Sequence, residues 1–422
     1  TSELEDAIQS LGSSISIRND VEGTYITGVT LNKNFDATMS ILIEILQEPR
    51  WDQKEFELLK TKAIENIIKS EGNPNFIAYR ENAKLKYNSN NILHYIGYGP
   101  KNKIEAVKID DLKKFYSQFY NLDNAKIKTG MVLRFYPEGF FVFPDYDIHK
   151  QFLIMQKLAD HDIKVPKVLW YEPSDEVFGT SFYVMEMASG DAPSDNPPFH
   201  QEGWVADSSE EVRERIWWGW VEQMAKIHQV DIANDDFEFL NRPELAKDYL
   251  DQELNYYFNF HEWAMDGEAH PVADQAREWL KANKPKPTQA SILWGDCRCA
   301  NIMYDPDGQV SAVLDWEMAA LGDPCMDLAW GIAIDDCNSK GVHVERLSGF
   351  PGPVATIAKW EALTGFSADD FDYYYILALY KFTVIMVKVV RKLEHYEIMP
   401  MGMNAHINNH VTPMLEAKLK EL

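Results

Sequence analysis

Apolar and polar positions repeat along the chain with two periods, and each period predicts one kind of element. Alternating apolar and polar residues predict strands, and apolar residues three or four positions apart predict helices. The expected strands span residues 14–18, 24–31, 131–134, 165–169, 181–185, 291–294 and 310–314. The expected helices span residues 4–11, 35–46, 53–71, 112–119, 147–159, 210–230, 353–363 and 370–392. The last of these is apolar on nearly every side, which predicts a buried helix.

The composition of the 422-residue chain changes near residue 125. Residues 1–125 hold 18 acidic and 15 basic side chains, whereas the remainder holds 48 acidic and 26 basic ones. Trp51 is the only tryptophan before residue 125, and eleven follow. Since this length allows two or three domains, we expect a domain boundary close to residue 125. The net charge of −25 disfavours nucleic-acid binding, which needs a basic face, and hints at a cationic substrate.

Neither a membrane span nor a signal peptide is visible in the sequence. No apolar run approaches the ~18 residues of a membrane-spanning helix, and the start, TSELEDAIQS, is acidic and polar. All four cysteines fall between residues 297 and 337. A disulfide framework would spread them out, so reduced thiols in a cytoplasmic protein are expected.

Residues 291–330 carry side chains suited to one kind of chemistry. Asp296 and Asp315 each follow a short expected strand, and Asn301 lies five residues after Asp296. Phosphoryl transfer to a hydroxyl needs one carboxylate to take the proton, and a second carboxylate and an amide oxygen to hold metal ions. The spacing of Asp, four residues and Asn matches a kinase catalytic loop. A β-hairpin with acidic turns is the alternative, and three ordered motifs in about forty residues argue against it.

These motifs, Gly-Asp-x4-Asn, Leu-Asp-Trp-Glu and Gly-Asp-Pro-x-x-Asp-Leu-Ala, resemble the aminoglycoside phosphotransferase family of small-molecule kinases, which includes choline-kinase-like proteins. The resemblance implies ATP as phosphoryl donor, Asp296 as catalytic base, and Asn301 and Asp315 as Mg²⁺ ligands. It also implies Asp323 and Asp327 as supports of the lower lobe. Trp294 replaces the family's usual histidine, which questions how the loop of the base is braced.

The same resemblance assigns nucleotide contacts further up the chain. Arg134 stands where kinases place the cation that binds the nucleotide phosphates, with an exposed strand-edge arginine as the alternative. Gln151 takes the place of the glutamate that steadies this cation, and its amide can still bond to the guanidinium. Met185, Glu186 and Met187 resemble the hinge whose backbone binds adenine, with a plain edge strand as the alternative. The aromatic residues of 235–285, with Glu253 among them, form either core or an acceptor pocket.

Residues 1–125 resemble a different family. Segments such as LQEPRWDQKEFELLK and VKIDDLKKFYSQFYNLDNAKI are similar to the insulinase-type zinc peptidases. The inverted zinc motif, His-x-x-Glu-His, is absent from the sequence, so Glu65 has no metal to complete and peptidase activity is not expected. The resemblance implies a non-catalytic fragment of an α/β module.

The combined expectation is an α+β protein with an N-terminal peptidase-like module and a kinase-like bilobal fold. The domains expected are residues 1–125, a partial kinase upper lobe at 126–190, and a mainly helical lower lobe at 191–422. Too little chain precedes Arg134 for the two strands and phosphate-covering loop of a complete upper lobe. The expected function is therefore an ATP- and Mg²⁺-dependent phosphotransferase acting on a small-molecule hydroxyl, with turnover impaired by the missing loop. A pseudokinase or an interaction protein is the alternative, and acceptor identity and oligomeric state stay open, hydroxyacyl groups included.

Overall fold

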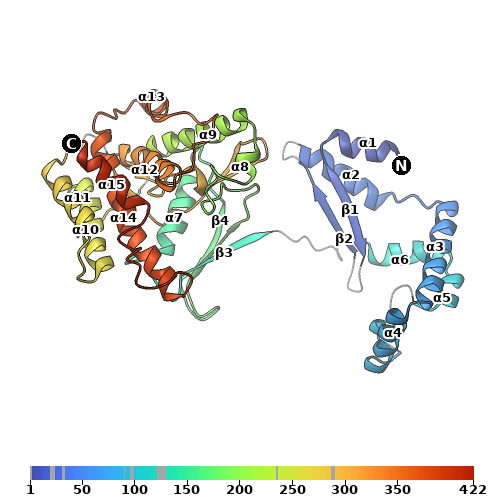
Figure 1. Cartoon of the computed structure of the whole chain (residues 1–422). Coiled ribbons are helices and arrows are strands. Elements are labelled where there is room, and N and C mark those ends of the chain that lie inside the picture. The colour runs from blue at the N-terminus through green and yellow to red at the C-terminus, as the bar shows by residue number, and fades with distance from the viewer. Residues whose placement is uncertain are drawn as a thin grey trace. The chain divides into compact units, whose positions relative to one another are not determined.

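The computed structural model describes residues 2–19, 24–30, 34–89, 91–95, 99–120, 130–233, 236–286 and 290–422. The chain divides into two compact units, Thr1–Lys128 and Thr129–Leu422, each visible in Figure 1. This division lies close to the change of composition near residue 125. The finer assignment of residues 126–190 and 191–422 to two kinase lobes stays a prediction.

The first unit contains one hairpin and a series of helices. Strands β1 (Ser14–Asn19) and β2 (Thr24–Val29) pair antiparallel. The helices are α1 (Ser2–Ser10), α2 (Phe35–Gln47), α3 (Gln53–Glu71), α4 (Pro74–Lys86), α5 (Lys101–Ala106) and α6 (Ile109–Phe119). The carboxylate of Asp52 begins α3 by accepting hydrogen bonds from two main-chain N–H groups. No residue of α3, α5 or α6 is buried, and Leu59 is 63% exposed. This unit therefore has little core of its own.

The second unit combines small sheets with long helices. Its strands are β3 (Met131–Phe135), β4 (Val168–Glu172), β5 (Phe182–Glu186), β6 (Ser291–Leu293), β7 (Ile302–Tyr304), β8 (Val310–Val313) and β9 (Ala320–Gly322). Its helices are α7 (Ile148–Leu158), α8 (Trp204–Asp207), α9 (Glu210–His228), α10 (Tyr249–Met265), α11 (Pro271–Ala282), α12 (Cys325–Cys337), α13 (Pro353–Thr364), α14 (Phe371–His395) and α15 (Val411–Lys420). The fold is thus a mixture of helices and strands, as expected.

The first sheet of this unit has the order β3-β5-β4, with both pairs antiparallel. Helix α7 contacts β4 and β5. Within the described residues no strand pairs with the outer edge of β3, where a complete kinase upper lobe would have its hairpin. Strand β4 begins at Val168, not at residue 165 as the alternation indicated, because Pro166 has no N–H to donate to a ladder.

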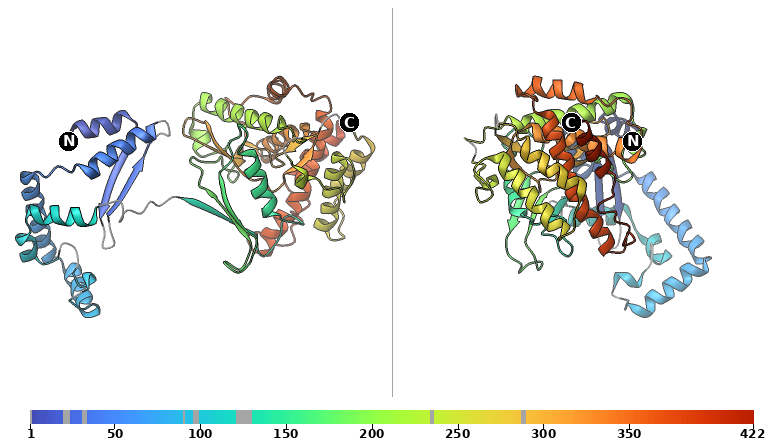
Figure 2. Two further views of the ribbon diagram at one scale, coloured as in Figure 1. Left: turned by 180° about the vertical axis from the view of Figure 1, so that it is seen from behind. Right: turned by 60° about the vertical axis from the view of Figure 1, so that its left-hand side comes forward.

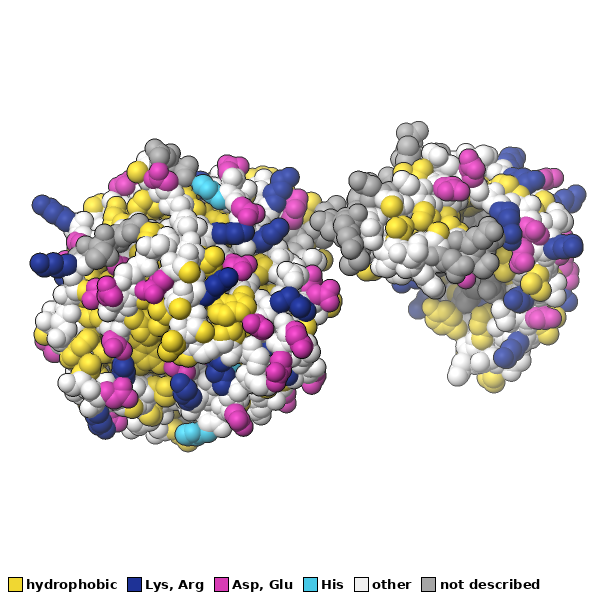
Figure 3. All heavy atoms as spheres, turned by 90° about the horizontal axis from the view of Figure 1, so that it is seen from above, with side chains coloured by type: hydrophobic (Ala, Val, Ile, Leu, Met, Phe, Trp, Pro, Cys, Tyr) yellow, Lys and Arg dark blue, Asp and Glu magenta, His cyan; other side chains and the backbone are white. Residues whose placement is uncertain are grey.

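The core of the second unit lies among its long helices. Helix α14 packs on α10, α11 and α12, and Figure 2 shows it in red beside the yellow helices α10 and α11. By length and composition α14 could cross a membrane, but 72% of its most apolar window is buried in the protein. The four cysteines are free and buried. On the visible face of each unit, charged side chains alternate with apolar patches (Figure 3).

Candidate active site

Asp296 and Asp315 each follow a strand of a short antiparallel pair. Asp296 follows β6, which pairs with β9, and Asp315 follows β8, which pairs with β7. The main-chain N–H of Leu314 donates to the main-chain oxygen of Asn301, and this hydrogen bond joins the two loops directly. Asp315 has a φ of 62°, a left-handed conformation that costs a non-glycine residue free energy. Strain of this kind gathers at functional sites, where the surrounding structure holds it.

The carboxylate of Asp296 is fixed by three donors. Oδ1 accepts from the indole Nε1 of Trp330 at 2.8 Å. Oδ2 accepts from the amide Nδ2 of Asn301 at 2.7 Å and from Nε of Arg298 at 3.0 Å. Because a carboxylate oxygen has two acceptor positions, Oδ1 keeps one position for a proton from elsewhere. Arg298 also binds Asp195 at 2.6 Å, which anchors the guanidinium between two carboxylates.

Two oxygen-bearing groups beside Asp296, on Asn301 and Asp315, fit a divalent cation. Asn301 uses its amide N–H on Asp296, and its amide oxygen has no hydrogen-bond partner among the described residues. Oδ1 of Asp315 is buried and likewise has no partner there. Burial and the charge of Asp296 raise the pKa of Asp315 to about 6. A cation would relieve this unfavourable burial of charge.

Glu317 adds a third carboxylate, which sequence reasoning did not assign. Burial and the charge of Asp315 raise its pKa to about 7. The motif Leu-Asp-Trp-Glu could have identified Glu317, which follows Asp315 by two residues. Across the described ranges, however, no three His, Cys, Asp or Glu side chains form a cluster able to hold a metal alone. The group therefore suits Mg²⁺, which completes its coordination with water and substrate phosphates.

Trp294, which stands where the usual histidine is expected, forms hydrogen bonds that brace the loop of Asp296. Its indole Nε1 donates to the main-chain oxygens of Leu314 at 2.8 Å and Asp315 at 3.2 Å. The carboxylate of Asp327 accepts from the main-chain N–H groups of Trp294, at 2.7 Å, and Gly295, at 3.0 Å. The loop of Asp296 is thus braced from both sides.

The supporting aspartates have buried partners of their own. Nε2 of His228 lies 3.2 Å from Asp327 Oδ2, and Nδ1 of His228 accepts from the indole of Trp360, so Nε2 carries the proton. His228 thereby orients the carboxylate of Asp327, which holds the loop of Asp296. Asp323 accepts from the main-chain N–H of Cys325 at the start of α12.

The nucleotide-side residues are arranged differently from the expectation. The guanidinium of Arg134 lies 3.4 Å from Glu317 Oε2. Gln151 is buried in α7 and accepts from the hydroxyl of Tyr183 at 3.4 Å. The expected bond from Gln151 to Arg134 is therefore absent among the described residues. The reason is charge: a carboxylate two residues beyond Asp315 attracts the guanidinium more strongly than a neutral amide does.

The segment expected to bind adenine lies at the end of β5. Met185 is partly buried, whereas Met187 is 64% exposed. The N–H of Glu186 donates to Lys167 O at 2.9 Å, and that of Met187 donates to Gly130 O at 3.3 Å. An adenine bound here must use the main-chain carbonyl groups or displace the bond from Met187 to Gly130. The assignment of Met185, Glu186 and Met187 to adenine binding stays a prediction.

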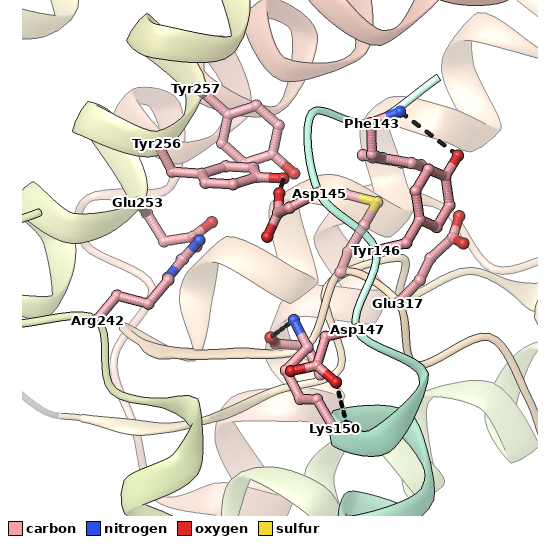
Figure 4. Close-up of a pocket in the computed structure, with 12 residues that line it drawn as sticks. Phe143, Asp145, Tyr146, Asp147, Lys150, Arg242, Glu253, Tyr256, Tyr257 and Glu317 are labelled. Carbon is pink, nitrogen blue, oxygen red and sulfur yellow. Dashed lines mark hydrogen bonds and ion pairs between the residues drawn. The ribbon is translucent and has the colours of Figure 1, made fainter. Parts of the chain in front are cut away.

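A pocket opens beside Glu317, as Figure 4 shows. Glu253, Tyr256 and Tyr257 of α10 line it, so part of the aromatic segment 235–285 faces a cavity and part is core. The remaining labelled lining residues are Phe143, Asp145, Tyr146, Asp147, Lys150 and Arg242, none of which the sequence singled out. The hydroxyl of Tyr256 donates to Asp145 at 2.7 Å.

Comparison with known proteins gives a family model and several relatives. The model described as the phosphotransferase enzyme family matches residues 115–346, more than half of the chain. The mouse protein named acyl-CoA dehydrogenase family member 10 is 27% identical over 201 residues, which cover 47% of this chain and 18% of that protein. The Helicobacter pylori protein named non-peptidase homolog YmxG is 25% identical over 117 residues, 28% of this chain and 27% of its own length.

One solved structure shares the fold of most of the chain. It is that of a protein from Ralstonia eutropha JMP134, provisionally described as an aminoglycoside phosphotransferase, with a TM-score of 0.52 and 18% identity. The match covers 74% of this chain and 97% of that one. The chain spans less than a third of each curated relative named above.

Proposed function

Because the chain belongs to the phosphotransferase enzyme family, we propose that it transfers the terminal phosphoryl group of ATP to a hydroxyl group of a small molecule, with Mg²⁺. One observation carries the proposal: Asp296, Asn301 and Asp315 meet at one place. Asn301 bonds to Asp296, and the charge of Asp296 raises the pKa of Asp315. Metal ligands and a base must lie together in this way for phosphoryl transfer.

Each residue has a distinct role in the proposed reaction. Oδ1 of Asp296 accepts the proton of the acceptor hydroxyl as its oxygen bonds to phosphorus and the bond from phosphorus to ADP breaks. Asp315 and the amide oxygen of Asn301 would hold Mg²⁺, and the ion would supply positive charge to neutralise the phosphate oxygens. Arg134 binds the phosphates once its contact to Glu317 loosens, and Met185–Met187 contact adenine. Catalysis rests on positioning and charge neutralisation.

Two measurements on the full chain test the proposal. Isothermal titration with ATP and Mg²⁺ is expected to show binding that Asp315→Ala weakens. Release of ADP in the presence of a hydroxyl acceptor is expected to fall about 10²- to 10⁴-fold in Asp296→Asn, the usual contribution of a general base. Asp307→Asn, an exposed turn carboxylate, is the matched control. Wild-type protein that binds no nucleotide, and that Asp315→Ala leaves unchanged, would contradict the proposal.

A pseudokinase is the second candidate, and it is favoured because no strand of the described residues pairs with the outer edge of β3. In a complete kinase upper lobe, a hairpin at that edge carries the loop that covers the phosphates and excludes water. Tight binding of Mg²⁺ and ATP without ADP release, for all acceptors tried, would support a pseudokinase. The same result would leave the proposed metal site standing while removing turnover.

For residues 1–125 we propose a non-catalytic peptidase-like module that acts in interaction. The name of the Helicobacter pylori relative and the absence of His-x-x-Glu-His support this proposal. Capture of a partner by full-length protein, lost when the exposed Leu58 and Leu59 become Ser, would test it. We also propose a cytoplasmic location, which the four free cysteines favour.

A further inference from the structure

Two cations lie in the walls of the pocket beside Glu317. Lys150 comes from the first turn of α7, and Figure 4 shows its ammonium group inside the pocket. Arg242 comes from the segment before α10 and pairs with Glu253. Burial and the charge of Arg242 both lower the pKa of Lys150, so the two cations are close enough to repel each other.

Lys150 lacks a carboxylate partner in the described part of the chain. Its ammonium donates only to the main-chain oxygen of Ala319, at 3.3 Å. A lysine ammonium has three donors and no acceptor, so two of its N–H groups remain for a ligand. A partly buried cation held by one carbonyl is an unfavourable arrangement in the absence of an anion.

The negative charges around the pocket are already engaged or stand at its exposed rim. Glu253 is shared by Arg242 and by the buried Lys381, at 3.3 Å, so two cations match one carboxylate. Glu317 faces Arg134 and the carboxylate of Asp315. Asp145 and Asp147 are exposed, and Asp147 also caps α7 through its bond to the N–H of Lys150. All four carboxylates line the pocket, but among the described residues none of them forms an ion pair with Lys150, so its ammonium keeps donors for a ligand.

The pocket adjoins the reacting groups. Glu317 is a lining residue, and the charges of Asp315, Asp296 and Lys150 all act on its pKa. Tyr257, on the opposite wall, lies close enough to Asp296 for that charge to help raise its pKa. A molecule in the pocket would thus lie next to the base proposed to take the hydroxyl proton.

We propose that this pocket binds the acceptor, and that the acceptor carries a carboxylate or phosphate group which Lys150 and Arg242 hold. The inference rests on the proposed phosphotransfer and names its substrate class. It runs against the cationic acceptor that the net charge of −25 suggested, because Lys150 offers donors inside the pocket that no carboxylate of the described residues takes up. The aromatic rings of Tyr256 and Tyr257 would cover the apolar part of the acceptor.

Ligand-observed NMR on the full-length protein can test binding separately from turnover. The probes are three- to five-carbon hydroxy acids, hydroxyl-bearing phosphate monoesters, the primary amides of the same acids, and amino alcohols. Saturation transfer is expected for one or both anionic classes and not for amides or amino alcohols. The two anionic classes, compared with each other, identify carboxylate or phosphate as the recognised group.

Variants of helix α7 connect the binding to Lys150. Lys150→Gln is expected to lower the affinity for anionic probes about tenfold or more, the usual effect of losing a hydrogen bond to a charged group. Lys150→Arg is expected to restore part of this affinity. Lys157→Gln, on the same helix and paired with Asp236 at the surface, is the matched control. Binding of ATP and Mg²⁺ is expected to stay within twofold in all three.

Several results would overturn the inference. They are equal binding of amides or amino alcohols, unchanged anion binding in Lys150→Gln, and no anion binding by wild type. Loss of ATP binding in Lys150→Gln would assign the lysine to the nucleotide instead. If wild type binds hydroxy acids through Lys150 but binds no nucleotide, the pocket assignment stands and the proposed phosphotransfer fails.

Discussion

The indole Nε1 of Trp294 donates to the main-chain oxygen of Leu314 at 2.8 Å. This bond joins the residue two positions before Asp296, the proposed base, to the residue directly before Asp315, a proposed Mg²⁺ ligand. The same indole reaches the oxygen of Asp315 at 3.2 Å. Since Trp294 is fully buried, no water is at hand to replace the donor. A tryptophan thus holds together the two loops on which the proposed reaction depends.

The first prediction concerns this bond. Trp294→Phe keeps an aromatic ring but removes the donor, which leaves two buried carbonyl groups without it. The free energy of unfolding is expected to fall by roughly 1–3 kcal/mol, the cost of an unsatisfied buried polar group. Affinity for ATP with Mg²⁺ is expected to fall as well, because the strained backbone at Asp315 loses its support. Denaturant unfolding and isothermal titration measure the two effects.

A matched control separates the indole N–H from the loss of ring area. Trp218→Phe makes the same chemical change on α9, where the half-buried indole donates to the exposed Glu214. It is expected to change stability by less than about 0.5 kcal/mol and nucleotide affinity not at all. Equal effects of both substitutions would show that the bond to Leu314 has no special role.

The second prediction concerns pH. The pKa values of Asp315 and Glu317 are raised to about 6 and about 7, from ordinary values of 3.8 and 4.5. Between about pH 4 and 7 the native protein therefore holds protons that the unfolded chain has released. Stability of the protein without metal is expected to fall as pH rises through this range, because the unfolded state binds fewer protons.

Urea unfolding between pH 4.5 and 8 checks this slope. Glu317→Gln is expected to flatten it and to be more stable than wild type at pH 8, because a buried charge has been removed. Mg²⁺ with ATP is expected to stabilise wild type more at pH 8 than at pH 5.5, since only ionised carboxylates bind the metal. Glu138→Gln, an exposed carboxylate, is the control. A slope that Glu317→Gln leaves intact would contradict the prediction.

Local spacing was enough to predict the loops of Asp296, Asn301 and Asp315, because these residues lie within twenty positions of one another. The pairing of Arg134 was not predictable in the same way. The resemblance assigned Gln151 to the expected helix 147–159, and the residue is buried in α7, but the sequence does not show that its amide oxygen accepts from Tyr183 and not from Arg134. Periodicity fixes which face of an element is buried, whereas partners from distant elements follow from the packing of the whole unit.

The pocket beside Glu317 illustrates the same limit. Lys150, Arg242 and Glu253 come from three segments spread over about a hundred residues. Each looks like an ordinary surface charge in the sequence, since lysine, arginine and glutamate are mostly exposed. Only the structure shows that they face one cavity and that Lys150 has no carboxylate partner among the described residues.

The third prediction concerns Arg134, whose side chain is 47% exposed and contacts Glu317 at 3.4 Å. Arg134→Met removes the charge proposed to bind the nucleotide phosphates and is expected to weaken ATP binding about tenfold or more, the loss expected for a charge-assisted hydrogen bond. Lys167→Met, an exposed cation beside the same sheet, is expected to leave affinity unchanged. Isothermal titration with ATP and Mg²⁺ measures both. If Arg134 is only a strand-edge arginine, Arg134→Met and Lys167→Met will bind ATP with equal affinity.

The last prediction concerns Gly295, which directly precedes the proposed base Asp296. Its φ is +90°, and a Cβ added there would lie 2.1 Å from the main-chain oxygen of Met318. Gly295→Ala must therefore shift the backbone near Met318. The alanine would also adopt a strained conformation that costs roughly 1–3 kcal/mol of stability. Because Asp296 moves with it, ADP release is expected to fall further than stability alone explains. Gly352→Ala is the control, since its φ is −76° and an added Cβ meets nothing within 4 Å. Thermal unfolding and ADP release, measured side by side at a temperature where both variants are folded, separate the two effects. A Gly295→Ala protein with wild-type turnover would mean that the close approach to Met318 does not position Asp296.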